Sequence, residues 1–299
     1  MLTRRHWLIL SAALPAAAHA ATPPLVVTSF SILADLVREI AGDRVKIVSL
    51  VGPDQDLHAY EPKPADLRTL AGADLLVLNG LGVEGWSARM AQASGFKGRI
   101  VVASNGIAPL PPATGGAAGA DAADGQFDPH AWQDVANVKR YVANIRDALA
   151  AIDPAGAAAC AAAATAYLAR LDRLDADIRA AYAPIPPARR RVITTHDALA
   201  YYGRAYGLTF RAPLGLSTES EPSAKDIAAL ERQITAEHIT ALFFENISNH
   251  TLLRQIARDT GARVGGVLYS DGRSPPGGPA ATYIAMMRDN LAQIVAALK

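Results

Sequence analysis

Four side chains that can bind metal share one sequence context, a loop that directly follows a predicted strand or precedes a predicted helix. In parallel α/β sheets, ligands bind outside the carboxyl ends of the strands, so all four occupy positions where a site is expected. Two of them lie in each half of the chain, and a cleft between the halves would bring them together. The four, with their surroundings, are His58 in GPDQDLHAYEPKPAD, His130 in FDPHAWQD, His196 in TTHDALAYY and Asp271 in LYSDGRS.

Three imidazoles and one carboxylate form a chemically coherent set of metal ligands. Neutral imidazole suits zinc and other late divalent metals, and four nitrogen and oxygen ligands can close a tetrahedral shell. A closed shell leaves no open position for a catalytic water, which favours binding over catalysis. The alternative is that each histidine is an ordinary loop residue bonded to its own backbone. His238 and His250 lack the strand-end context, and we expect both at the surface.

The sequence motifs of the common hydrolases and nucleotide-binding enzymes are absent. The chain has no HExxH pair for a zinc protease, no G-x-S-x-G nucleophile turn and no G-x-x-x-x-G-K-[ST] phosphate loop. Gly80 and Gly82 follow a predicted strand but do not complete a dinucleotide-binding motif. The sequence therefore predicts a binding protein and no enzyme, with a metal-dependent enzyme in the same cleft as the alternative.

The composition restricts the possible partners. Lys and Arg total 29 against 28 Asp and Glu, a net charge of +1, whereas a general nucleic-acid or anionic-membrane binder would carry a clear basic excess. The single cysteine, Cys160, excludes an internal disulfide and a thiolate metal cluster. We expect Cys160 to be a small buried or half-buried residue of a helix.

Strands and helices alternate at the short spacing that is typical of parallel α/β sheets. The pattern occurs in both halves of the chain, and each half is predicted to form a mainly parallel sheet flanked by helices. The predicted strands are Pro24–Ser29, Val45–Val51, Leu75–Asn79, Ile100–Ala103, Arg191–Thr194, Leu208–Ala212, Ala241–Glu245 and Val264–Tyr269. The predicted helices outside the middle of the chain are Ile32–Ala41, Lys63–Ala71, Glu84–Ala93, Val135–Ala151, Ala198–Tyr206, Ser223–Ala236, Leu252–Thr260 and Tyr283–Leu298.

A long helix is predicted at the middle of the chain, from Asp153 to Tyr182. Asp153 is a favourable N-cap, Pro154 suits the first helical position, and an alanine-rich run follows. Apolar residues recur every three or four positions up to Tyr182, and Pro184 ends the helix. At about 1.5 Å per residue the rod is about 44 Å long, enough to span two domains.

This helix divides the chain into two lobes, and the first twenty residues form a separate segment. They contain Arg4 and Arg5, a short apolar core and the A-x-A sequence that ends at Ala20, which together predict an export signal cleaved near Ala20. Export by the general or the twin-arginine route stays open. No cysteine stands at the cleavage site, so we expect a free periplasmic protein without a lipid anchor or membrane helix. The predicted divisions are 1–20 signal peptide, 21–152 first lobe, 153–183 linking helix and 184–299 second lobe.

The motifs around these residues resemble those of the zinc and manganese solute-binding proteins of ABC importers, the cluster A-I or ZnuA/TroA-like family. The similarity covers the mature chain through GPDQDLHAYEPKPADL, DPHAWQDVANV, the long helix, TTHDALAYYGRAYGL, FFENISN and LYSDG. It implies two α/β lobes joined by one rigid helix, with a metal ion between them. By motif, His58 and His130 would be the metal ligands from the first lobe, and His196 and Asp271 those from the second.

The resemblance also implies a function and partners. The expected ligand is Zn²⁺, bound for transport and delivered to an inner-membrane ABC permease by a monomeric carrier, with or without a periplasmic metallochaperone. Manganese-preferring relatives often have Glu where this chain has His196, so zinc is favoured and manganese is the alternative. An adhesin with the same fold is a further alternative.

One segment departs from the pattern of zinc-specific relatives. Pro109–Gly125 takes the place of a loop rich in His, Asp and Glu, but it contains no histidine. We expect a flexible insertion that acts as a lid or contacts a partner. Asp128, Glu61 and Asp197 are candidates to orient the metal-binding histidines, and release of the metal is expected through small lobe tilts and rearrangement of the loops that carry His58 or Asp271.

Overall fold

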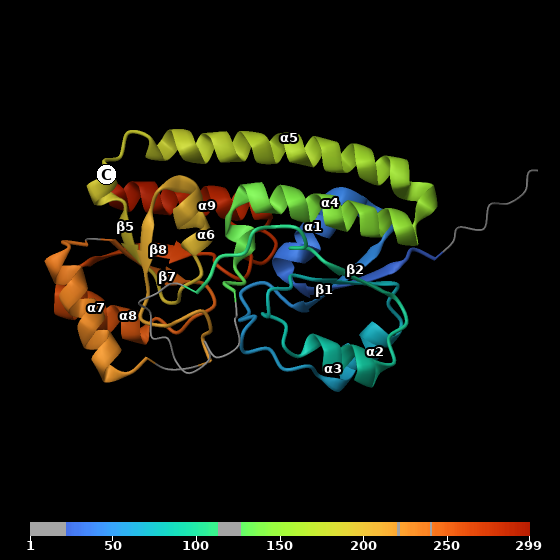
Figure 1. Cartoon of the computed structure of the whole chain (residues 1–299), viewed down its shortest axis with the longest axis horizontal. Helices are drawn as coiled ribbons and strands as arrows, with labels where there is room; N and C mark the ends of the chain where they lie inside the picture. The colour runs from blue at the N-terminus through green and yellow to red at the C-terminus, as the bar shows by residue number, and fades with distance from the viewer. Residues whose placement is uncertain (1–21, 113–126, 220–221, 240) are drawn as a thin grey trace, which may run out of the picture.

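Two parallel four-stranded sheets form the framework of the molecule (Figure 1). The computed structural model describes residues 22–112, 127–219, 222–239 and 241–299; the predicted signal peptide and most of the Pro109–Gly125 segment lie outside these residues. The first sheet has the strand order β2-β1-β3-β4 and the second β6-β5-β7-β8, with every pairing parallel. The strands are β1 (Leu25–Phe30), β2 (Lys46–Val51), β3 (Leu75–Leu78), β4 (Arg99–Val102), β5 (Arg191–Ile193), β6 (Thr209–Arg211), β7 (Ala241–Glu245) and β8 (Arg263–Leu268).

Helices cover both faces of each sheet, which confirms the predicted α/β class. We refer to β1–β4 with α1–α4 as lobe 1 and to β5–β8 with α6–α9 as lobe 2; α5 joins them (Figure 1). The helices are α1 (Ser31–Ala41), α2 (Pro64–Ala71), α3 (Ser87–Ser94), α4 (Val135–Ile152), α5 (Ala157–Tyr182), α6 (Ala200–Tyr206), α7 (Ala224–Ala236), α8 (Thr251–Thr260) and α9 (Tyr283–Leu298).

The linking helix α5 runs along the length of the molecule (Figure 1). Its 26 residues span about 39 Å. It packs against α1 and α4 of lobe 1 and against α6 and α9 of lobe 2. One 3₁₀ turn precedes it, where the Asp153 side chain accepts a hydrogen bond from the Gly156 N–H, as expected of an N-cap. Cys160 is buried on α5, as predicted.

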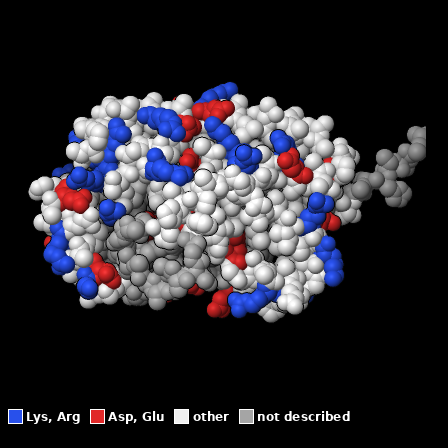
Figure 2. Space-filling model, viewed as in Figure 1, with Lys and Arg blue, Asp and Glu red and all other residues white. Residues whose placement is uncertain are grey.

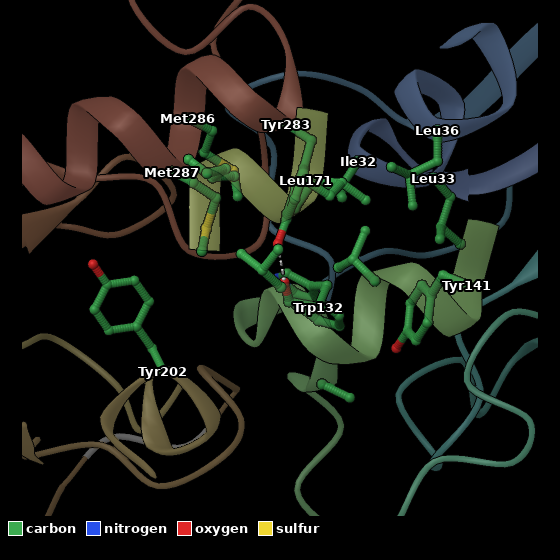
Figure 3. Packing of buried hydrophobic residues seen from close by; sticks show 14 of the residues in the cluster. Ile32, Leu33, Leu36, Trp132, Tyr141, Leu171, Tyr202, Tyr283, Met286 and Met287 are labelled. Carbon is green, nitrogen blue, oxygen red and sulfur yellow. Dashed lines mark hydrogen bonds between the residues drawn. The ribbon is translucent and has the colours of Figure 1, made fainter. Parts of the chain in front are cut away.

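A single hydrophobic core continues from lobe 1 through α5 into lobe 2. Successive side chains of a strand point to opposite faces, so each sheet contributes alternate residues to this core. In β3, Leu75 and Val77 join it, and in β7 Ala241 and Phe243 do. Figure 3 shows the middle of this core, where Leu171 of α5 lies near Trp132, Tyr283 and the two methionines of α9.

The opposite face of each sheet is covered by a small cluster of its own. In lobe 1 the cluster lies with α2 and α3 and includes Leu76, Leu78 and Met90. In lobe 2 it lies with α7 and α8 and includes Leu242 and Phe244. The two lobes therefore share one core on one side and have separate cores on the other.

Two local expectations were wrong. Helix α3 begins at Ser87, whereas the sequence predicted a start at Glu84. The Glu84 side chain is buried and accepts hydrogen bonds from Ser29 and from the backbone at the end of β3, so it is not free to begin a surface helix. His250 is partly buried: its ring stacks on Phe244 with centroids 4.2 Å apart. His238 is exposed, as expected.

The surface carries both signs of charge. Figure 2 shows basic and acidic side chains interspersed over one face, in keeping with the net charge of +1. Among the described residues, no helix has both the length and the apolar character required to cross a bilayer.

Candidate metal centre

The structure brings the four residues selected from the sequence to one point between the lobes. His58 follows β2, His130 lies ahead of α4, His196 follows β5 and Asp271 follows β8. Each of them offers one ligand atom, and the four atoms lie within 4.8 Å of one another. The side chains of His130, His196 and Asp271 are fully buried, and that of His58 is 7% exposed. The His58 side of the cluster is therefore the side nearest to solvent.

The spacing of the ligand atoms fits a small cation. His58 Nε2 lies 3.2 Å from His130 Nε2 and 3.2 Å from Asp271 Oδ2. His196 Nε2 also lies 3.2 Å from Asp271 Oδ2, and His130 Nε2 lies 3.6 Å from Asp271 Oδ1. Four ligands at 2.0–2.1 Å from one tetrahedral zinc ion would lie about 3.3 Å apart. The separations given above, 3.2–3.6 Å, lie close to this value.

Several of these atoms make no hydrogen bond to the described part of the protein. Both carboxylate oxygens of Asp271 and Nε2 of His196 are buried and accept or donate no hydrogen bond in the described residues. Buried polar atoms without a partner are costly, and native proteins contain few of them. A bound cation would satisfy all three at once, so the donor set fits a metal.

Two further carboxylates orient the fully buried histidines. Asp128 Oδ1 lies 2.8 Å from His130 Nδ1 and also accepts the His130 backbone N–H. Glu245 Oε2 lies 2.7 Å from His196 Nδ1. A carboxylate at Nδ1 fixes the tautomer and leaves the Nε2 lone pair free for a metal. The imidazoles of His130 and His196 are thus held with Nε2 towards the common centre.

Of the three carboxylates considered from the sequence, only Asp128 contacts a site histidine in the part of the chain that the structure describes. Glu61 is exposed, and Asp197 uses its backbone N–H to bond Gly215. Sequence reasoning missed Glu245. The available signal was a charged residue at the end of the otherwise apolar strand ALFFE, because a buried carboxylate requires a partner.

Charges within the site favour ionised carboxylates. Burial alone would raise the pKa of Asp271, but His196 and His130 outweigh it and hold that pKa well below its usual range. Burial would lower the pKa of His196, whereas Glu245 and Asp271 beside it raise that pKa well above its ordinary value. The ionised carboxylate of Asp271 therefore makes the centre favourable for a cation.

Comparison with known proteins agrees with this geometry. Residues 26–297 match the family model of the zinc-uptake complex component A, periplasmic. The chain is 34% identical to the manganese-binding lipoprotein MntA of Halalkalibacterium halodurans over 91% of this chain and 88% of that one. It is also 34% identical to the zinc-binding protein TroA of Treponema pallidum, over 92% and 89% of the two chains.

A third relative and a solved structure extend the comparison. The iron-binding protein YfeA of Yersinia pestis is 32% identical over 88% of this chain and 82% of its own length. The structure of the periplasmic zinc-binding protein TroA of Treponema pallidum superposes with a TM-score of 0.84, covering 93% of this chain and 99% of that one at 32% identity. The chain therefore belongs to the family of the periplasmic zinc-uptake component A, whose members are metal-binding, substrate-binding proteins of ABC importers and not enzymes.

Proposed function

We propose that this protein binds one Zn²⁺ ion through His58, His130, His196 and Asp271 and delivers it to an ABC permease of the inner membrane. The observation that carries the proposal is the mutual spacing of three imidazoles and one carboxylate around one centre. Neutral imidazole suits zinc better than the hard cations, and four ligands complete the tetrahedral shell that zinc prefers. The metal is cargo in this proposal, so its tight but reversible binding is the function itself.

The sequence of the first twenty residues and the relatives support a periplasmic setting for this function. We infer export to the periplasm by the predicted signal peptide, with cleavage near Ala20, and action there as a monomer. A metallochaperone that loads the protein is compatible with this scheme. Since the histidines must lose their protons to bind zinc, the affinity should fall as the pH is lowered.

Manganese is the second candidate, and one feature of the site favours it. Both oxygens of Asp271 are buried without a partner, and both could bind the same ion. Such bidentate binding would raise the coordination number to five, and oxygen ligands suit manganese. The relatives carry manganese, zinc and iron in their names, so the choice of metal depends on measurement.

The test is a competition titration of the mature, untagged protein after removal of metal with a chelator. We expect one equivalent of Zn²⁺ to bind at least a hundred times more tightly than Mn²⁺ or Fe²⁺, and binding to be lost in His58→Ala and His196→Ala. His238→Asn is the matched control, because His238 is exposed and has a positive φ that Asn tolerates. Tighter Mn²⁺ binding would move the function to manganese import, and no stoichiometric binding of either metal would refute the carrier proposal.

Delivery to a permease needs a separate measurement in cells. Deleting the gene should lower cellular zinc under zinc limitation, and the wild-type chain should restore it. His130→Ala should fail to restore it, whereas an adhesin would keep its surface binding in the same variant.

A further inference from the structure

Asp271 directly follows β8 of lobe 2 in the sequence, but most hydrogen bonds of its loop are made with residues of lobe 1. We refer to residues 270–282 as the Asp271 loop. The carbonyl oxygen of Ser270, one residue before Asp271, accepts a hydrogen bond of 2.9 Å from Trp132 Nε1 and one of 2.7 Å from Gln133 Nε2. Trp132 and Gln133 follow His130 in lobe 1 and are fully buried.

The other half of the loop is attached to α1 of lobe 1. The Arg273 backbone N–H donates to Ser31 Oγ at 3.1 Å, and Arg273 Nε donates to the Ser31 carbonyl at 2.8 Å. Just after the loop, at the first residue of α9, the Tyr283 backbone N–H donates to Asp35 Oδ2 at 2.7 Å. Ser31 and Asp35 are both buried in α1. Lobe 1 therefore holds the loop on both sides of Asp271.

The hydrogen bonds that attach this segment to lobe 2 lie mainly at Tyr269, one residue before the Asp271 loop begins. Asn290 of α9 bonds both the backbone N–H and the carbonyl of Tyr269, each at 2.8 Å. Beyond Tyr269, lobe 2 contacts the loop at two points. Asn246 donates a hydrogen bond of 3.1 Å to the Gly272 carbonyl, and Glu245 lies next to the Ser270 hydroxyl. The chain thus passes from lobe 2 attachment to mainly lobe 1 attachment between Tyr269 and Ser270.

We propose that Trp132 and Gln133 are positioning residues that fix Asp271 to lobe 1, so that Asp271 and His130 stay together when the lobes part and His196 is the ligand that leaves. Separating Asp271 from lobe 1 would strip the buried Ser270 carbonyl of two buried donors, and buried polar groups left without a partner are costly. His196, by contrast, is held by Glu245 through its ring and its backbone N–H, and both residues belong to lobe 2. This proposal rests on the proposed function, because it assigns the order in which the same metal site opens.

Amide hydrogen exchange on the wild-type protein tests the partition directly. The Arg273 and Tyr283 amides donate across to lobe 1, and the Tyr269 amide donates within lobe 2. We expect the Arg273 and Tyr283 amides to keep their protection, within about threefold, when zinc is stripped from the protein. The Tyr269 amide is the internal control. Loss of protection at Arg273 and Tyr283 with Tyr269 unchanged would show that Asp271 leaves with lobe 2 and would overturn the proposal.

A matched pair of variants tests the role of Gln133. Gln133→Met removes one donor to Ser270 at nearly constant volume, and Asn290→Met removes the lobe 2 attachment of Tyr269. Gln133→Met should speed zinc dissociation about tenfold, lower the protection of Arg273 and change the visible spectrum of the cobalt-substituted site, since Asp271 moves. Asn290→Met should leave the cobalt spectrum unchanged.

The outcomes separate this proposal from the function it rests on. If wild-type protein binds no zinc, the proposed function fails. If wild-type protein binds zinc but Gln133→Met has an unchanged dissociation rate and cobalt spectrum, only the positioning role fails. A purely structural role for Gln133 would lower thermal stability without changing the spectrum of the folded, cobalt-loaded protein, and this result also overturns the proposal.

Discussion

The two lobes have the same strand order, and each places a buried glutamate where its central strands end. In lobe 1, Glu84 accepts a hydrogen bond of 2.7 Å from the Ser29 hydroxyl and one of 2.6 Å from the Asn79 backbone N–H. In lobe 2, Glu245 accepts the backbone N–H groups of Thr195 and His196, each at 2.8 Å. Both carboxylates thus bind the ends of neighbouring parallel strands together.

The two glutamates differ in what faces their second oxygen. Glu84 Oε2 accepts the Gly80 backbone N–H, whereas Glu245 Oε2 faces the ring of His196. Burial raises the pKa of Glu84. Burial acts in the same direction on Glu245, but His196 reverses it and lowers the pKa of that carboxyl. The same strand-end carboxylate therefore supports the fold in one lobe and orients a candidate metal ligand in the other.

The first crossover explains why only lobe 2 has a histidine at this point. In lobe 1, β1 ends at Phe30 and α1 begins at Ser31 with no loop between them. In lobe 2, β5 ends at Ile193 and α6 begins at Ala200, which leaves six residues for a loop that can carry His196 to the centre. This connection gives the chain room to bring the His196 side chain to the centre, whereas at the corresponding point of lobe 1 the chain is already helical.

The largest expected effect is a difference in zinc affinity between glutamine variants of Glu245 and Glu84. In Glu245→Gln the Oε1 position must still accept two N–H groups, so the new amide NH₂ faces His196 Nδ1 and disturbs its tautomer. Zinc affinity should fall about a hundredfold. Glu84→Gln should leave zinc affinity within twofold in the same competition titration. Equal losses in both variants would contradict the functional difference between the lobes.

A smaller loss is expected at Asp128, the carboxylate that contacts Nδ1 of His130 in lobe 1. Asp128 uses only Oδ1 towards His130, and its Oδ2 has no partner among the described residues. Asp128→Asn can therefore keep the hydrogen bond and lose only the charge, so zinc affinity should fall about tenfold. The comparison with Glu245→Gln under identical conditions checks it; a greater loss in Asp128→Asn would show that charge matters more than hydrogen-bond direction.

The contact between the lobes at the mouth of the site should affect rates more modestly. Thr218 of lobe 2 donates to Asp56 Oδ2 at 2.5 Å, and Asp56 Oδ1 accepts the His58 backbone N–H. Thr218→Val removes this hydrogen bond, worth about 0.5–1.5 kcal/mol, and should speed zinc dissociation by about 2- to 10-fold in stopped-flow measurements. Thr165→Val on the exposed face of α5 is the control and should leave the rate unchanged. An unchanged rate in Thr218→Val would mean that the contact does not restrain the His58 loop.

The smallest effect should appear in the pH dependence of stability. The pKa of Glu84 is higher in the folded protein than its ordinary value, so the folded state binds this proton more tightly than the unfolded chain. The stability that this proton contributes is present at low pH and is lost as the pH rises through the folded-state pKa. In urea unfolding of metal-free protein, the free energy of unfolding of Glu84→Gln should therefore increase relative to that of wild type as the pH rises above 4.5, the ordinary pKa of a glutamate. A difference that is independent of pH would contradict the raised pKa.

The sequence predicted the fold and the four candidate ligands because the relevant signals are local. Apolar runs and turn residues mark where each strand ends, and His58, His196 and Asp271 lie just beyond such ends. Glu245 was not recognised, because its partner His196 is 49 positions away and only pairing of β5 with β7 brings them together. The start of α3 was misplaced for the same reason, since the hydrogen bond of Glu84 to Ser29 crosses 55 positions.

The attachment of the Asp271 loop to lobe 1 was beyond sequence reasoning as well. Trp132 and Ser270 are 138 positions apart, and nothing in either segment indicates that the loop crosses to the other lobe. The pattern around Asp271 predicts only a loop after a strand. Local periodicity therefore finds ligands, whereas the residues that hold them depend on how distant segments pack.

The uninterrupted core along α5 has a consequence for how the molecule denatures. Buried residues from β1 to α9 belong to one hydrophobic cluster, so neither lobe can expose its inner face without exposing part of the other's. Unfolding by heat or urea should therefore occur in one cooperative transition, rather than in two successive transitions of separate domains. A cavity made on α5, as in Leu171→Ala, should lower the melting temperature of both lobes together, and a chain cut between them should yield no fragment that folds alone.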